Sequence, residues 1–180
     1  MTRDRIDLLQ QQWRSERPEL DPTPMAVVGR VLRLAKLLEA SLERALQPFE
    51  LAAWEFDVLA TLRRHGAPYR MSATRLATSS MLTSGAMTNR IDRLEQRGLV
   101  ERLADPNDRR GVVVALTPRG IELVEQAVAA RFEEAAARLA GIAKTDRERL
   151  AQGLRRMLLA FPGEALEEAP QPPEPEQGSR

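Results

Sequence analysis

The chain has 180 residues, with 27 Lys and Arg residues against 26 Asp and Glu residues, and 43% of its residues are hydrophobic but only 4% aromatic. This length suits one compact domain with extensions, and the scarcity of aromatic rings favours helices packed with Leu, Ala and Val. The lack of cysteine excludes disulfides and thiolate metal sites, and a single histidine, His65, argues against a histidine metal cluster or a Ser-His-Asp triad. We therefore expect no catalytic residue, no metal and no enzymatic activity.

Charge is unevenly distributed along the chain. Residues 162–180 hold five acidic residues and one basic residue, which leaves 26 basic against 21 acidic residues in the remainder. A body of that charge is compatible with nucleic-acid binding, and equally with a slightly basic enzyme. No apolar run is long enough for a signal peptide or a membrane span, which predicts a cytoplasmic protein without a membrane partner.

The first two segments, 1–22 and 23–50, are each predicted to carry one amphipathic helix. The first has Ile6, Leu9 and Trp13 on one face and ends in a proline-punctuated connector. The second begins at Thr23-Pro24, with Thr23 as the N-cap, and ends before Pro48. Its expected buried stripe consists of Val27, Val31, Leu34, Leu38, Leu42 and Leu46.

Segment 51–117 is predicted to contain three helices and a hairpin. A helix over 52–65 is followed by a short helix over 73–78 capped by Ser72, and then by a basic helix from an N-cap at Thr83 to a stop at Gly98. The apolar stripe of that last helix is Met87, Ile91 and Leu94. Strands over 99–103 and 112–116 flank a charged loop, 105–111, tipped by Arg109 and Arg110. An exposed helix beside such a hairpin is typical of a winged helix-turn-helix that reads DNA.

Segment 118–161 is predicted to form two further helices, and 162–180 a disordered acidic, proline-rich tail. The first starts at Thr117-Pro118, and the second opens with a capping box, Thr145-Asp146-Arg147-Glu148. Their apolar faces, with that of segment 23–50, are wider than a small winged domain covers. We therefore expect a two-fold homodimer that presents two reading helices to palindromic double-stranded DNA, the alternative being a monomeric helical bundle.

A helical wheel divides the residues of the basic helix. Opposite the apolar stripe lie the candidates for DNA contact, which are Gly85, Thr88, Asn89, Asp92, Arg93 and Gln96, with Ser84 suited to phosphate. An ordinary solvated helix face is the alternative. Arg90 lies about 65° from the centre of the stripe and should point into a seam between helices. Asp57 is its natural partner, either in an ion pair that orients the helix or in a site where an anionic ligand competes for Arg90.

Several motifs in order resemble the MarR family of bacterial transcription regulators over about residues 25–160. They are Leu82-Thr83-Ser84, Asn89-Arg90-Ile91-Asp92-Arg93-Leu94-Glu95, Arg97-Gly98-Leu99-Val100, Asp105-Pro106-Asn107-Asp108-Arg109-Arg110-Gly111 and Leu116-Thr117-Pro118-Arg119-Gly120. The resemblance implies a mainly α winged helix-turn-helix dimer, held together by its terminal helices. Such a dimer binds operator DNA as a repressor, less often as an activator, and is commonly released by a small ligand. It also implies that Arg110 enters the minor groove, that Asp108 orients Arg110, and that Arg109 lies near phosphate.

A narrower resemblance is to the urate-responsive HucR/PecS-like subgroup. An extra N-terminal helix with Trp13, Asp57 in Phe56-Asp57-Val58-Leu59, and Arg90 in Thr88-Asn89-Arg90-Ile91 match that subgroup. The sequence departs from it at Arg75, where an acidic partner is expected. The resemblance implies no cofactor, and an effector such as urate or another aromatic or anionic compound, bound by Trp13, Asp57 and Arg90. The alternative function is a winged-helix module that contacts proteins without reading DNA sequence.

Overall fold

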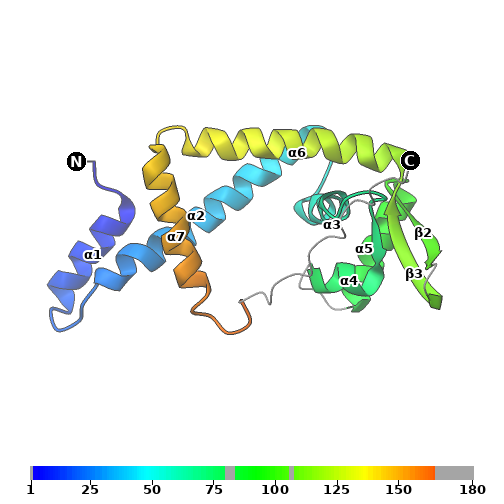
Figure 1. The fold of residues 1–180 in the computed structure, drawn as a ribbon. Coiled ribbons are helices and arrows are strands. Elements are labelled where there is room, and N and C mark those ends of the chain that lie inside the picture. The colour runs from blue at the N-terminus through cyan, green and yellow to red at the C-terminus, as the bar shows by residue number, and fades with distance from the viewer. Residues whose placement is uncertain (1, 80–83, 106–107, 165–180) are drawn as a thin grey trace, which may run out of the picture. The chain divides into compact units, whose positions relative to one another are not determined.

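The computed structural model describes residues 2–79, 84–105 and 108–164 and divides the chain into two compact units, Met1–Ala135 and Ala136–Arg180 (Figure 1). The helices are α1 (Arg5–Glu16), α2 (Thr23–Leu46), the 3-10 helix η1 (Gln47–Phe49), α3 (Ala53–Arg64), α4 (Ala73–Ser79), α5 (Ser84–Gln96), α6 (Pro118–Leu139) and α7 (Lys144–Leu158). The strands are β1 (Arg70–Ser72), β2 (Val100–Asp105) and β3 (Asp108–Leu116). Within the described ranges, no helix combines the length and the apolar character that a membrane span requires.

The small sheet has three antiparallel strands in the order β1-β3-β2. The predicted hairpin is confirmed, because Val100 pairs with Leu116 and Leu103 with Val113. Strand β1 was not predicted. Its three residues alone show no alternation long enough to mark a strand, and its pairing with residues 113–115 of β3 creates it.

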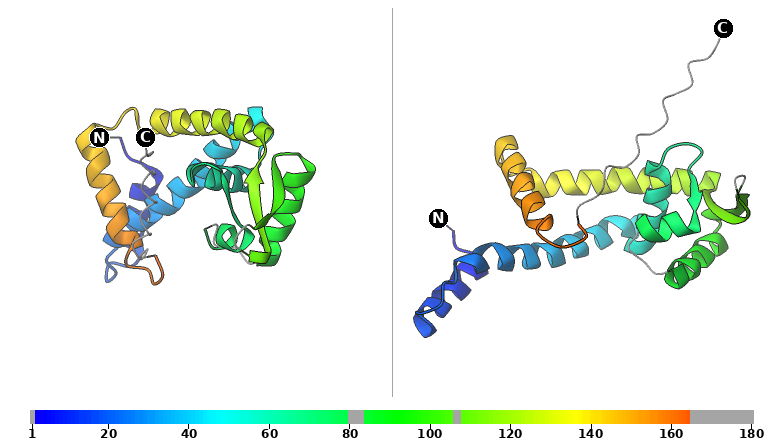
Figure 2. Two further views of the ribbon diagram at one scale, coloured as in Figure 1. Left: turned by 45° about the vertical axis from the view of Figure 1, so that its right-hand side comes forward. Right: turned by 60° about the horizontal axis from the view of Figure 1, so that its bottom comes forward.

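The core of the first unit lies between α3, α4, α5, the sheet and the facing ends of α2 and α6 (Figures 1 and 2). Its fully buried side chains, at or below 1% exposure, are Leu46, Val58, Leu59, Leu62, Leu76, Met87, Ile91, Leu94, Leu99, Val114, Val124 and Ala127. These buried side chains are aliphatic, as the low aromatic content predicts, and Phe49, Trp54, Phe56 and Tyr69 pack against them from the edge of the core.

The predicted buried stripe of α2 is wrong for the single chain. Leu46 is fully buried, whereas Val27, Leu34 and Leu38 are 55%, 51% and 43% exposed. The reason is geometric: only the C-terminal end of α2 reaches the core, and the N-terminal half has α1 beside it (Figures 1 and 2). Val31 and Leu42 are half-buried, and Leu42 packs against the core, so the uncovered apolar face consists of Val27, Leu34 and Leu38.

Two predicted helix starts are displaced. Thr23 is the first residue of α2 rather than its cap, and its N–H donates to Asp21 Oδ1 at 2.9 Å. The capping box at Thr145 is wrong, because α7 begins at Lys144 behind Ala143, which has no side chain able to cap. The predicted tail lies outside the described residues from position 165 onward.

Candidate nucleic-acid interface

Helix α5 is anchored by the stripe that its periodicity predicts. Met87, Ile91 and Leu94 are 0%, 1% and 0% exposed. Burial on this scale contributes about 1.5–3 kcal/mol for each large apolar side chain. Gly98 follows the helix at a φ of +66°, a left-handed conformation that glycine adopts without strain, and it ends the helix as predicted. The predicted N-cap, Thr83, lies outside the described residues.

The opposite side of α5 faces solvent. Thr88, Asn89 and Arg93 are exposed, as the wheel indicates. Ser84 and Gly85 are the first two residues of the helix, and the side chain of Ser84 lies outside the described part of the structure. The helix therefore presents amide, hydroxyl and guanidinium groups outward from a rigidly packed base.

The hairpin beside α5 is longer than predicted. Strand β2 continues to Asp105 and strand β3 begins at Asp108, so the predicted seven-residue loop is mostly strand. Asp108, Arg109 and Arg110 are thus the first residues of β3, although the positions of their side chains lie outside the described part. Ladder hydrogen bonds extend the strands beyond what alternation along the sequence reveals.

Arg90 points inward as predicted, but its partner is different. Its guanidinium carbon lies 5.3 Å from the ring centroid of Trp54, in cation–π geometry. Among the described residues, no ion pair joins Arg90 to Asp57. Trp54 and Asp57 are three residues apart on α3, and therefore neighbours on its surface. Arg90 thus points into the expected seam between helices, which here lies between α5 and α3, and there it meets the Trp54 ring.

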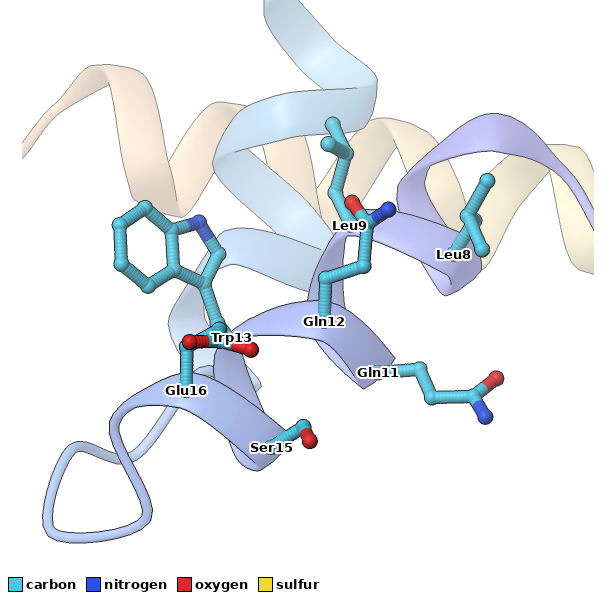
Figure 3. Close-up of a pocket in the computed structure, with 7 residues that line it drawn as sticks. All are labelled: Leu8, Leu9, Gln11, Gln12, Trp13, Ser15 and Glu16. Carbon is cyan, nitrogen blue, oxygen red and sulfur yellow. The ribbon is translucent and has the colours of Figure 1, made fainter.

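Trp13 is not brought together with Asp57 and Arg90 in one chain. It is 53% exposed on α1 and projects from that helix with Leu9 and Gln12 (Figure 3). A groove beside it is formed by Leu20, Asp21, Pro22 and Met25. Because α1 lies beside the N-terminal half of α2, whereas α3 and α5 lie at its other end, one chain does not form the predicted three-residue site (Figure 1).

Three ion pairs that orient α5 were missed by sequence reasoning. Arg97 donates to Glu55 of α3 at 2.8 Å, and Glu55 is itself buried. Arg102 of β2 bonds Asp92 and Glu95 of α5. Partial burial lowers the pKa of Arg102, but the hydrogen bonds to both carboxylates outweigh it, so its pKa is raised. The charges of Asp92, Glu95 and Arg102 were visible in the sequence, but their pairing depends on how the strand crosses the helix.

Among the described residues, no three His, Cys, Asp or Glu side chains are grouped as a metal site would require.

Comparison with known proteins agrees with this geometry. The MarR family model matches residues 51–112. The HTH-type transcriptional regulator PecS of Dickeya dadantii is 42% identical over 123 residues, which cover 68% of this chain and 74% of PecS. The multiple antibiotic resistance protein MarR of Salmonella typhimurium is 39% identical over 85 residues, covering 47% of this chain and 57% of that protein.

Solved structures show the same fold. AbsC, a MarR family transcriptional regulator from Streptomyces coelicolor, superposes with a TM-score of 0.71 at 27% identity, over 78% of this chain and 95% of AbsC. A mutant MarR from E. coli complexed with operator DNA gives a TM-score of 0.64 at 26% identity, over 81% of this chain and 97% of that one. Such relatives are regulators rather than enzymes. With an anchored helix α5 and its adjoining hairpin, these matches show that the chain belongs to the MarR family of DNA-binding transcriptional regulators.

Proposed function

We propose that the chain is a homodimeric repressor that reads a palindromic operator and is released by a small anionic or aromatic ligand. The observation that carries the DNA-reading part is the outward face of α5, where Thr88, Asn89 and Arg93 stand exposed above the buried stripe. Asn pairs with adenine and Arg with guanine at the edges of the major groove. The related MarR structure complexed with operator DNA supports this use of the fold.

Each DNA-facing residue has a proposed role. Asn89 and Arg93 read bases with Thr88, while Ser84 and the Gly85 backbone approach phosphate at the helix N-terminus, where the dipole favours an anion. In the hairpin, Arg110 enters the minor groove, Asp108 orients it and Arg109 lies near phosphate. The placement of 108–110 at the start of β3 supports this assignment, because it puts all three close to the tip of the hairpin.

Fluorescence anisotropy with duplexes from the DNA upstream of the gene tests this proposal. Arg110→Ala should weaken binding to every sequence and reduce the slope of log affinity against log salt by about one. Arg93→Ala should cost about 1–3 kcal/mol and also blur base preference. Equal affinity of wild type and both variants would reject the proposed DNA contacts. If the wild type binds no duplex at any salt concentration, the alternative of a protein-contact module is favoured.

The ligand part of the proposal rests on Arg90 and its seam. A cation–π contact stabilises a guanidinium over an aromatic ring by about 0.5–2 kcal/mol. An anion with moderate affinity for the Arg90 guanidinium could therefore draw it away from the Trp54 ring. The displaced side chain would bring the ligand against Asp57 of α3 and tilt α5. We further propose that Trp13 reaches this site from the second protomer, because the exposed apolar faces of α1 and α2 need a covering chain.

Titration with urate, a phenolic acid and a simple carboxylate distinguishes these roles. Release of operator DNA by one of them should be lost in Arg90→Ala and weakened in Trp13→Phe, with DNA affinity in the absence of ligand kept in Trp13→Phe. A ligand that binds should also raise the melting temperature by mass action. Full release from Arg90→Ala would eliminate Arg90 from the ligand site while leaving the DNA-binding proposal intact.

A further inference from the structure

Arg102 joins helix α5 to the hairpin through three hydrogen bonds. From β2, its Nη2 donates to Asp92 Oδ1 at 2.5 Å, and its Nη1 donates to Glu95 Oε2. Its backbone N–H donates to Glu95 Oε1 at 3.1 Å. Because Asp92 and Glu95 are three residues apart on one side of α5, one strand residue fixes a whole helical turn.

The same carboxylates lie beside the groups proposed to read DNA. Asp92 is three residues after Asn89 and four after Thr88, spacings that make it their neighbour on the helix surface. The Asp92 and Glu95 side chains are 46% and 39% exposed, so a bound DNA backbone would meet their charge. Two carboxylates next to phosphates repel them, and the single guanidinium of Arg102 offsets part of that charge.

We propose that Arg102 is a positioning residue for operator recognition, which sets the angle of α5 against the hairpin and shields Asp92 and Glu95 from DNA phosphate. This inference rests on the proposed DNA-reading function. It assigns a DNA-binding role to a residue that need not touch DNA itself. The two parts of that role, angle and charge, have separate experimental signatures.

Operator binding by Arg102→Met tests the role, with Arg70→Met as the matched control. Arg70 is an exposed arginine of the same sheet, so its loss removes the same charge without breaking a bond to α5. Arg102→Met should bind the operator about tenfold more weakly at low salt, with a penalty that shrinks as salt screens the freed carboxylates. The control should change affinity by less than about threefold, the effect of a single distant charge.

Removal of the carboxylates separates charge from angle. The triple variant Asp92→Asn, Glu95→Gln, Arg102→Met should regain affinity for random-sequence DNA, because the repulsion is gone. The ratio of its affinity for the operator to its affinity for random-sequence DNA should stay below that of wild type, because α5 is no longer tied to β2. A loss caused only by lower stability would follow the melting temperature, would not vary with salt and would not be relieved by removing the carboxylates.

The outcomes separate this inference from the function beneath it. Wild-type protein that binds no duplex overturns both. Wild type that binds, with Arg102→Met equal to it in affinity and ratio, overturns only the role of Arg102, as does a triple variant that regains nothing. If circular dichroism shows Arg102→Met unfolded, the double variant Asp92→Asn, Glu95→Gln, which retains Arg102, decides: a wild-type operator-to-random ratio contradicts the inference, and a reduced ratio supports it.

Discussion

Gly120, in the first turn of α6, touches the backbone that enters the hairpin. A Cβ built at Gly120 would lie 2.0 Å from the carbonyl oxygen of Leu99, far inside van der Waals contact. Thr117 reinforces this junction, because its Oγ1 donates to the Gly98 carbonyl at 2.7 Å and accepts from the Gly120 N–H at 3.0 Å. The start of α6 and the link between α5 and β2 therefore meet backbone to backbone at Leu99, and only glycine permits that approach.

Gly120→Ala should destabilise the protein by about 2–4 kcal/mol, because a backbone carbonyl cannot rotate away as a side chain could. Gly153→Ala in α7 is the matched control, since nothing lies within 4 Å of an added Cβ there. That control should be neutral or stabilising by about 0.5–1 kcal/mol through helix propensity. Urea unfolding measures both free energies, and equal stability of the two variants would contradict the close approach.

The sequence predicts the direction of the Arg90 side chain but not its partner. The wheel places Arg90 at the border of the buried face, and its half-buried position confirms that direction. The choice between Asp57 and Trp54 was not available from the sequence, because the two lie one turn apart on α3 and both suit a guanidinium. How far α3 is shifted along α5 decides whether Trp54 or Asp57 lies opposite Arg90, and in the structure it is Trp54.

Polar contacts tie helix α1 to α2 and to the turn between them. Arg30 donates to Asp4 at 2.8 Å and to Asp7 at 2.6 Å, and Gln10 Nε2 donates to the Pro22 carbonyl at 2.9 Å. Hydrogen bonding from Arg30, and then from the Asp7 backbone as well, lowers the pKa of Asp4. The Asp4 backbone N–H, and then Arg30, lower the pKa of Asp7.

Acid should therefore release α1. Two contacts lower these carboxyl pKa values, the docking bond from Arg30 and the cap of α1 itself, so both kinds of stabilisation are fully present above the ordinary value of 3.8 and are lost as the pH falls through the lowered pKa values. In a Trp54→Phe background, Trp13 is the remaining tryptophan, and its emission should change below about pH 4. In Arg30→Met the docking is already weakened at neutral pH, so the acid transition should be smaller and should retain only the part due to the cap of α1. The same transition in both proteins would exclude Arg30 as its cause.

Periodicity along the sequence was enough to predict the helices and the hairpin, and it failed where an element depends on a distant partner. The stripe Met87, Ile91 and Leu94 carries its own signal, so α5 was predicted within a few residues. Strand β1 exists because β3 pairs with it, and the hairpin is longer than predicted because its two strands pair with each other. The contacts of Arg102 with α5 likewise arise from a crossing that no local pattern encodes.

Several helices expose large apolar side chains. On α2, the residues Val27, Leu34 and Leu38 are exposed, and on α6 Phe132 is 73% exposed. On α7, in the second unit, Leu154 is also exposed. Scattered apolar side chains are ordinary on protein surfaces, but several on successive turns of one helix mark an interface. A second copy of the chain is the covering partner that the proposed palindromic operator requires.

The final prediction is that this apolar face holds the dimer together. Light scattering should give about twice the chain mass of 20.2 kDa for wild type. The double variant Leu34→Asp, Leu38→Asp places charges where the second copy would dehydrate them, at a cost of several kcal/mol, and should be monomeric and bind operator DNA more weakly. Leu103→Asp, at a 37% exposed leucine of β2, introduces a charge away from α2 and should remain dimeric. A dimeric double variant would place the interface elsewhere, whereas monomeric wild type would contradict the proposed homodimer.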